Sequence, residues 1–180
     1  YQKNLKALIV SNMVPSVPDY NDYAKNVLAL QLDPNILKEI RSYEAVQDYT
    51  NETYLKLIHD NYYPKHVMRI PAANWPEDVS NAFAEINFPI YLKLQGPSEF
   101  GMVGDASLKN WDVTKDLKKL EIPFLSIGAK YDTMDPIQME WMANEVQNGF
   151  YLNCPNGSHM AMWDDTDNYF AGLINFIGTL

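Results

Sequence analysis

An aspartate and a histidine in the last third of the chain each follow an apolar segment that predicts a strand. Asp132 comes shortly after residues 122–129, and His159 comes shortly after residues 150–154, so that 27 residues separate the two. In an open α/β sheet, reactive groups collect in loops beyond the carboxyl ends of the strands, and adjacent parallel strands bring such loops together. The pair would then form the orienting half of a nucleophilic triad, in which the carboxylate fixes the imidazole tautomer. The order of acid before histidine matches the order in hydrolases.

Simpler interpretations of the same residues stay open at this point. A histidine in a loop is more often a surface or capping residue, and an aspartate after a strand is often a turn former. Asp132 and Asp135 lack the spacing of a calcium-binding loop, so no metal site is predicted. His59 and His66 lie beside tyrosines in a helical region and are expected to be packing or surface residues.

The elements that must position these residues change in type near residue 120. Residues 5–13 predict a buried parallel strand. Residues 19–118 are helical in pattern, aromatic and interrupted by prolines. Helices are predicted in four places: around an apolar stripe at Tyr20, Tyr23, Val27 and Leu30, from Asp33-Pro34, over 51–58, and over 76–86.

After residue 120, strand and helix alternate, which predicts an α/β class with parallel strands covered by helices. A helix is expected from Asp135-Pro136, with Gln138 completing a capping box and Gly149 ending the helix. Its buried face is expected at Met139, Met142, Ala143 and Val146. The last helix is expected from about Asp164, with Asp164, Asp165 and Asp167 in its first turn and Tyr169, Phe170, Leu173, Ile174 and Ile177 facing inward.

Composition narrows the class of protein. The chain has 180 residues, 47% of them hydrophobic, and a formal charge of −9. Such a chain forms a packed core, and its acidity argues against nucleic acids and anionic membranes as partners. No apolar run reaches the ~20 residues of a membrane helix. The single cysteine, Cys154, is expected to be buried and inert and excludes an intrachain disulfide framework. The opening at Tyr1, without an initiator Met, suggests a fragment or a processed chain.

The nucleophile of a triad is not evident. A hydrolase of this kind carries a G-x-S-x-G turn that exposes the serine between a strand and a helix. The nearest sequence, residues 96–101, has the wrong spacing and lies in the helical region. Ser98 is therefore not taken as a nucleophile, and none is predicted within the chain.

Two runs, residues 127–136 and 154–165, resemble the C-terminal part of the proline iminopeptidases (prolyl aminopeptidases), which are α/β-hydrolases with a helical cap. The resemblance extends through residues 95–100, 110–112 and 8–13, and so covers essentially the whole chain. The Asp and His loops occur in many α/β-hydrolases, whereas the G-P-S-E-F run at 96–100 is a much more specific motif. The resemblance implies a core strand at 1–14, a helical cap at 15–119, and the C-terminal hydrolase core at 120–180.

The resemblance also implies roles for particular residues. Asp132 becomes the triad acid, His159 the general base, and Glu99 a cap carboxylate that binds the free α-amino group of the substrate. Thr133 stands where some relatives carry a second carboxylate. An apolar slot for the proline ring is also expected. From residue type alone, the candidates to line it are Phe100, Trp111, Tyr131 and Trp163.

The function implied is a serine-type aminopeptidase that releases N-terminal proline from peptides, without a cofactor. Because this chain lacks the nucleophile half, it is predicted to be inactive alone. Its expected partners are a peptide with a free N-terminal proline, and either the missing N-terminal half or a second copy of the chain. Two alternatives remain: another α/β-hydrolase (an esterase, epoxide hydrolase or C–C bond hydrolase) that has no use for Glu99, and a non-catalytic binding fragment.

Overall fold

The computed structural model describes residues 2–180, and these residues form two compact units. Unit 1 comprises the chain up to Ser16 together with Asp112–Leu180, and unit 2 comprises Val17–Trp111. The predicted division into core and cap, at 14/15 and 119/120, stays a prediction about the domains of the protein.

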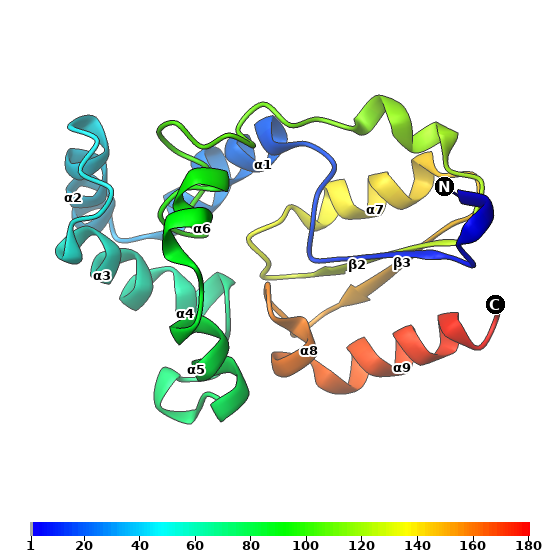
Figure 1. Ribbon diagram of the computed structural model, residues 1–180. Helices are drawn as coiled ribbons and strands as arrows, with labels where there is room; N and C mark the ends of the chain where they lie inside the picture. The colour runs from blue at the N-terminus through cyan, green and yellow to red at the C-terminus, as the bar shows by residue number, and fades with distance from the viewer. Residues whose placement is uncertain (1) are drawn as a thin grey trace. The chain divides into compact units, whose positions relative to one another are not determined.

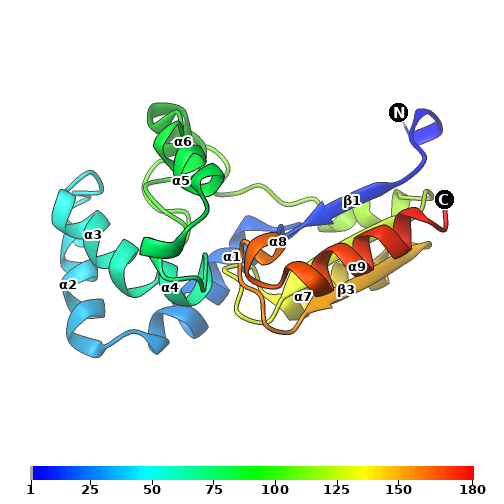
Figure 2. The same cartoon turned by 90° about the horizontal axis from the view of Figure 1, so that it is seen from below.

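Unit 1 is an α/β unit built on parallel strands. In the described part of the chain, β1 (Leu8–Ser11), β2 (Phe124–Ala129) and β3 (Gly149–Cys154) form one sheet in the order β1-β2-β3. Helix α7 (Pro136–Glu145) covers one face, and α8 (Ala161–Asp164) and α9 (Thr166–Ile177) cover the other (Figure 1). β1 and β3 lie at opposite edges (Figure 2). The α/β class with helix-covered parallel strands is confirmed.

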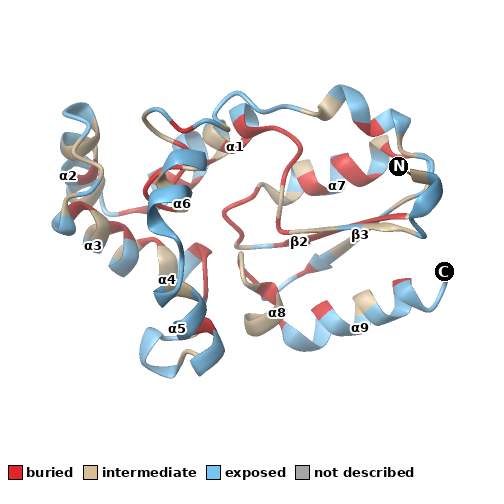
Figure 3. Ribbon diagram, viewed as in Figure 1, coloured by how far each residue is buried: buried red, intermediate tan, exposed pale blue. Residues whose placement is uncertain are grey.

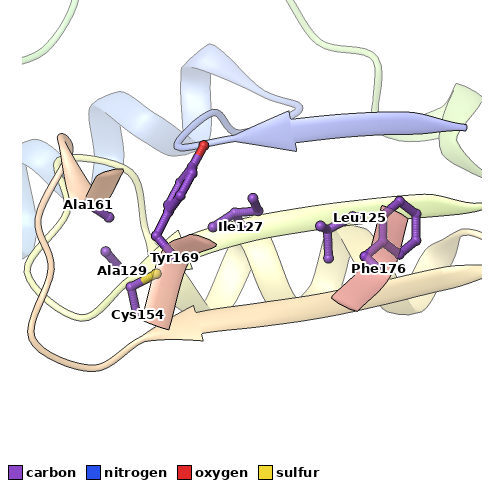
Figure 4. Close-up of a cluster of buried hydrophobic side chains, with 7 residues drawn as sticks. All are labelled: Leu125, Ile127, Ala129, Cys154, Ala161, Tyr169 and Phe176. Carbon is purple, nitrogen blue, oxygen red and sulfur yellow. The ribbon is translucent and has the colours of Figure 1, made fainter. Parts of the chain in front are cut away.

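The central strand β2 is buried along its whole length (Figure 3). Its side chains alternate between the two faces of the sheet, as the period of a strand requires. Phe124 packs with residues of α7, whereas Leu125 and Ile127 pack in the cluster beneath α9 (Figure 4). A strand that is buried on both faces consists of a nearly continuous run of apolar residues. This run is the feature that predicts the strand from the sequence.

Helix α9 turns a different face to the sheet from the one predicted. Tyr169 and Phe176 are buried, whereas Phe170, Ile174 and Ile177 are 43%, 67% and 50% exposed. Gly172 explains the rotation, because a Cβ at this position would lie 2.4 Å from the side chain of Leu152 on β3. The helix carries two apolar stripes, and the close approach at Gly172 selects one of them.

Helix α7 has the predicted start and buried face, but two details were wrong. Asp135 caps the helix by accepting a hydrogen bond from the backbone N–H of Ile137 at 2.9 Å, and Met139, Met142, Ala143 and Val146 are buried. The capping box is not formed, because Gln138 Oε1 has no hydrogen-bond partner among residues 2–180. Gly149 does not end the helix; α7 ends at Glu145, and Gly149 begins β3.

Gly149 allows β3 to start directly against the end of α7. A Cβ added there would lie 1.8 Å from the carbonyl oxygen of Ala143, which is backbone and cannot move aside like a flexible side chain. We expect Gly149→Ala to destabilise the protein by about 3 kcal/mol. Thermal unfolding followed by circular dichroism measures this, with Gly178→Ala as the control, since its added Cβ would meet backbone oxygens only at 3.4 Å. Equal melting temperatures for the two variants would contradict the expectation.

Unit 2 is helical, as predicted. Its helices are α1 (Val17–Tyr23), α2 (Pro34–Ala45), α3 (Glu52–Asn61), α4 (Tyr63–His66), α5 (Glu77–Ala84) and α6 (Phe88–Leu94). A π-helical turn at Ala24–Leu28 and a 3-10 turn at Ala29–Gln31 follow α1, and a further 3-10 turn spans Ala72–Asn74. Unit 1 has two more 3-10 turns, at Gln2–Asn4 and Thr114–Lys119. Within residues 2–180, every helix is too short or too polar to span a bilayer.

The π-helical turn corrects one predicted stripe. Val27 and Leu30 were expected to face inward, but they are 44% and 71% exposed. Ala24 and Leu28 are buried in their place. A π-helical turn contains more residues than an α-helical turn, so it rotates the buried face away from the 3.6-residue spacing on which the prediction rested.

Candidate active site

The loops that follow β2 and β3 are joined at the carboxyl end of the sheet. The two strands end in register, with Ala129 opposite Cys154. The N–H of Lys130 donates to the carbonyl of Cys154 at 3.1 Å, and the N–H of Tyr131 donates to the carbonyl of Gly157 at 3.1 Å. These backbone bonds fix the two loops against each other at the level of Asp132 and His159.

Asp132 and His159 are in direct contact. His159 Nδ1 lies 2.9 Å from Asp132 Oδ1, the carboxylate is fully buried, and the imidazole is partly exposed. The N–H of Met134 also donates to Oδ1, at 3.0 Å. A buried, hydrogen-bonded carboxylate holding one ring nitrogen leaves the other nitrogen for proton transfer. The structure therefore brings together the two residues that the sequence singled out, and their catalytic roles stay predictions.

Thr133 adds a hydroxyl to this contact. Its Oγ1 lies 3.1 Å from His159 Nδ1 and donates to Asp132 Oδ1 at 3.4 Å. The side chain is fully buried. In this chain the position therefore contributes a neutral hydrogen-bonding group to the Asp–His pair, where some relatives are expected to carry a carboxylate.

Asn12 is a member of the site that the sequence analysis missed. It follows β1 directly, is buried, and donates from Nδ2 to Asp132 Oδ2 at 2.6 Å and to the carbonyl of Ser158 at 3.3 Å. One signal in the sequence pointed to it: a polar residue directly after a predicted parallel strand lies at the same sheet edge as the loops of Asp132 and His159.

Two carboxylates hold the loop that carries His159. Asp164 accepts hydrogen bonds from the N–H of Ser158 at 2.9 Å and from its hydroxyl, and Asp165 accepts from the N–H of Asn156 at 3.0 Å. Both had been expected in the first turn of the last helix. They instead lie at the end of α8 and before α9, where they accept hydrogen bonds from backbone N–H groups of the loop that carries His159.

Cys154 is fully buried at the end of β3. Burial raises the pKa of its thiol to about 12, and the carboxylates of Asp165, Asp164 and Asp132 add to the effect. The thiol therefore stays protonated below that value, and only the thiolate reacts with thiol reagents. We expect no modification of the native chain by a chromogenic disulfide reagent at about pH 8, and modification of one thiol per chain after unfolding. Rapid labelling of the native protein would contradict this expectation.

Glu99 lies in unit 2 among tyrosines. The Tyr91 hydroxyl donates to Glu99 Oε1 at 2.6 Å, and the Tyr20 hydroxyl donates to the Glu99 carbonyl at 2.8 Å. Burial, and then the neighbouring Glu99 carboxylate, raise the pKa of the Tyr91 hydroxyl, which therefore remains a donor at neutral pH. Glu99 Oε2 is buried and has no hydrogen-bond partner among residues 2–180. A buried carboxylate oxygen without a donor is suited to an incoming cationic N–H group.

The four predicted slot residues divide between the units. Phe100 and Trp111 belong to unit 2, and Tyr131 and Trp163 to unit 1. Phe100 is buried, with its ring edge-on to Tyr62 and the Arg41 guanidinium 5.4 Å from its centre. Trp111 is 37% exposed, and Tyr131 and Trp163 are half-buried. Contact of these side chains with a proline ring stays a prediction.

The other residues considered in the sequence have local partners. Ser98 is buried in unit 2 and accepts a hydrogen bond from the N–H of Phe100. His66 is buried against Tyr62, and His59 is exposed beside Asp60. Within residues 2–180, no group of three or more His, Cys, Asp or Glu side chains is placed to hold a metal ion.

Comparison with known proteins gives close relatives by sequence, although no protein-family model matches the chain. The chain is 49% identical to the proline iminopeptidase of Flavobacterium johnsoniae and 48% identical to that of Elizabethkingia meningoseptica, over 177 residues in each case. Both matches cover 98% of this chain and 58% of the relative. The chain thus spans little more than half the length of these curated relatives.

Solved structures show the same fold. The crystal structure of VinJ matches with a TM-score of 0.88 at 25% identity, and that of proline iminopeptidase from Mycobacterium smegmatis matches with a TM-score of 0.82 at 23% identity. Each match covers 98% of this chain and 58% of the other. The chain thus corresponds by sequence to a C-terminal part of proteins named proline iminopeptidase, and its fold is that of the α/β-hydrolases.

Proposed function

We propose that this chain supplies the acid and the base of a serine-type aminopeptidase that releases N-terminal proline from peptides. The observation that carries the proposal is the 2.9 Å contact between Asp132 Oδ1 and His159 Nδ1 beyond the ends of β2 and β3. It occurs in a chain that is 49% identical to a protein named proline iminopeptidase. Other α/β-hydrolases would use the same pair, so the choice of substrate rests on the relatives and on Glu99.

In the proposed mechanism, Asp132 holds the proton on Nδ1 of His159, and Nε2 takes the proton of a serine hydroxyl. The serine oxygen attacks the carbonyl carbon of the N-terminal proline. The peptide C–N bond then breaks, and the departing amine takes the proton back from Nε2. Water then gives a proton to Nε2 while its oxygen attacks the acyl carbon. The bond from this carbon to the serine oxygen breaks, the serine oxygen takes the proton back from Nε2, and free proline is released.

Glu99 is proposed to select a free N-terminus. The substrate's charged amino group would donate to the buried Oε2, the oxygen that has no partner among residues 2–180, while Tyr91 occupies Oε1. A peptide with a blocked N-terminus would leave this carboxylate buried and unpaired, which is costly. Charge and hydrogen bonding together then favour an aminopeptidase over an enzyme that cuts internal bonds.

The nucleophile is proposed to come from an N-terminal part like that of the relatives, which this sequence does not contain. Within residues 2–180, β1 pairs only with β2, so its other edge has unpaired backbone groups, and Ile9 is 39% exposed. An open strand edge readily pairs with a further strand. The preferred partner of this edge is the N-terminal part of the protein, rather than a second copy of the chain.

The 180-residue chain alone is expected not to release proline, because a base without a nucleophile has no covalent route. A steady-state assay with a proline arylamide tests this. The comparison is the same chain joined behind the N-terminal part of the Flavobacterium johnsoniae relative, called the joined protein below. Turnover by the isolated chain that is lost in His159→Ala would show that the expectation is wrong.

The proposed function itself is tested on the joined protein with a proline arylamide and its N-acetylated counterpart. Proline release from the free substrate, with at least a hundredfold lower kcat/KM for the acetylated one, supports the aminopeptidase. Equal rates on both, or turnover of simple esters only, would instead support another α/β-hydrolase with the same Asp–His pair.

A further inference from the structure

We propose that Asn12 is a positioning residue, which holds the Asp132 carboxylate so that Oδ1 faces His159 and keeps the imidazole in one tautomer. The inference rests on the proposed function, since it assigns a role within the same site. In unit 1, the single side chain of Asn12 links the segments that follow all three strands of the described sheet.

The Asn12 amide engages both halves of the Asp–His pair. Nδ2 donates to Asp132 Oδ2 at 2.6 Å and to the carbonyl of Ser158, the residue before His159, at 3.3 Å. Oδ1 of Asp132 receives the other bonds, from His159, Met134 and Thr133. Asn12 is thus the donor that occupies Oδ2, and it opposes rotation of the carboxylate about its Cβ–Cγ bond.

The orientation of the Asn12 amide is itself fixed. The Ser11 hydroxyl donates to Asn12 Oδ1 at 2.7 Å, so Nδ2 must point the other way, toward the carboxylate. The Tyr169 hydroxyl in turn donates to Ser11 Oγ at 3.0 Å. Figure 4 shows Tyr169 reaching from α9 toward the end of β1. A chain of hydrogen bonds thus runs from Tyr169 through Ser11 and Asn12 to Asp132, and each bond fixes the orientation of the next group.

The backbone at this position also favours asparagine. Asn12 has a φ of 52°, in the left-handed region, and its N–H donates to the Ile127 carbonyl at 2.9 Å. Asparagine enters this region more readily than most side chains. The residue is buried, so an amide there is stable only if it is hydrogen-bonded. A strained backbone conformation, burial and a short bond to the Asp132 carboxylate together identify the position as functional rather than a simple turn.

Imidazole ¹⁵N chemical shifts test the proposal on the 180-residue chain at about pH 8, where an unperturbed imidazole is neutral. The chain has 3 histidines, and the His159→Gln variant identifies the signals of His159. We expect one tautomer, protonated at Nδ1, in the unmodified chain. In Asn12→Gly, which suits a positive φ, the ratio of the Nδ1-H to the Nε2-H form should fall about tenfold.

The control is Gln47→Gly, which makes the same kind of change at another non-glycine residue with a positive φ, 59°. It should leave the His159 signals unchanged. Ser11→Ala removes the donor that orients the Asn12 amide while it keeps Asn12 itself, and it should shift the tautomer ratio in the same direction by a smaller factor. Circular dichroism confirms folding of each variant, and Ser11→Ala decides the matter if Asn12→Gly does not fold.

An unchanged single tautomer in folded Asn12→Gly would overturn the proposal, as would an equal change in Gln47→Gly. The spectra need neither substrate nor nucleophile, so their result is independent of whether the joined protein releases proline. In the joined protein, Asn12→Gly should lower kcat about tenfold with little change in KM, because the base is misaligned but the substrate contacts remain. A change in KM alone would assign Asn12 to substrate binding and overturn the positioning role.

Discussion

Asp132→Asn is expected to lower kcat for proline release by the joined protein about 10⁴-fold. The buried carboxylate accepts a hydrogen bond from His159 Nδ1 at 2.9 Å. An amide in its place can turn an N–H group toward that nitrogen, which favours the tautomer that carries its proton on Nε2. An imidazole protonated at Nε2 cannot accept the proton of the serine, so the base is lost although the shape of the site is kept.

The matched control for this substitution is Asp167→Asn, an exposed position on α9. It makes the same change of charge and should leave kcat within a factor of about 2, as expected for a surface substitution away from the site. Steady-state kinetics with a proline arylamide measure both variants. A loss of less than tenfold in Asp132→Asn would exclude Asp132 as the residue that orients His159.

Glu99→Gln is expected to lower kcat/KM for peptides with a free N-terminal proline about 10²-fold, since removal of one partner of a buried charge pair costs about 3 kcal/mol. The low activity on N-acetylated substrates should stay the same, so the discrimination between free and blocked N-termini collapses. The variant keeps a group that accepts the Tyr91 hydrogen bond, which in the unmodified chain is 2.6 Å long. The loss therefore reports the charge rather than a collapsed pocket.

Glu85→Gln serves as the control in the same unit, because Glu85 is exposed and follows α5. It should change kcat/KM for either substrate by no more than a factor of about 2. If Glu99→Gln retained the preference for free N-termini, the amino-group contact would have to be assigned to another residue.

The Asp–His contact could be predicted from the sequence because it depends on topology. Two apolar segments with one helix between them predicted parallel strands, and the carboxyl ends of parallel strands meet at one sheet edge. Asn12 lies at the same edge, but its strand is separated from β2 by a hundred or so residues of helical sequence, and its partner across the sheet could not be read from local spacing. Register, which sets Ser11 opposite Ile127, comes only from the structure.

Side-chain direction was less predictable than element type. α9 was predicted as a helix, but it has two apolar stripes, and the contact of Gly172 with Leu152 selects the face. The stripe after α1 was misplaced because a π-helical turn has no clear signal in the sequence. α6 was not among the predicted helices; Pro89 lies in its first turn, and Asn87 caps it. The Tyr91 contact of Glu99 was missed with it.

The most direct measurement is kcat for proline release by Asp132→Asn, His159→Ala and the double variant of the joined protein. If the two residues act as one unit, the double variant loses no more activity than His159→Ala alone, because an aspartate cannot orient an imidazole that is absent. Losses that multiply, so that the double variant is slower by the product of the two factors, would contradict a catalytic pair formed by Asp132 and His159.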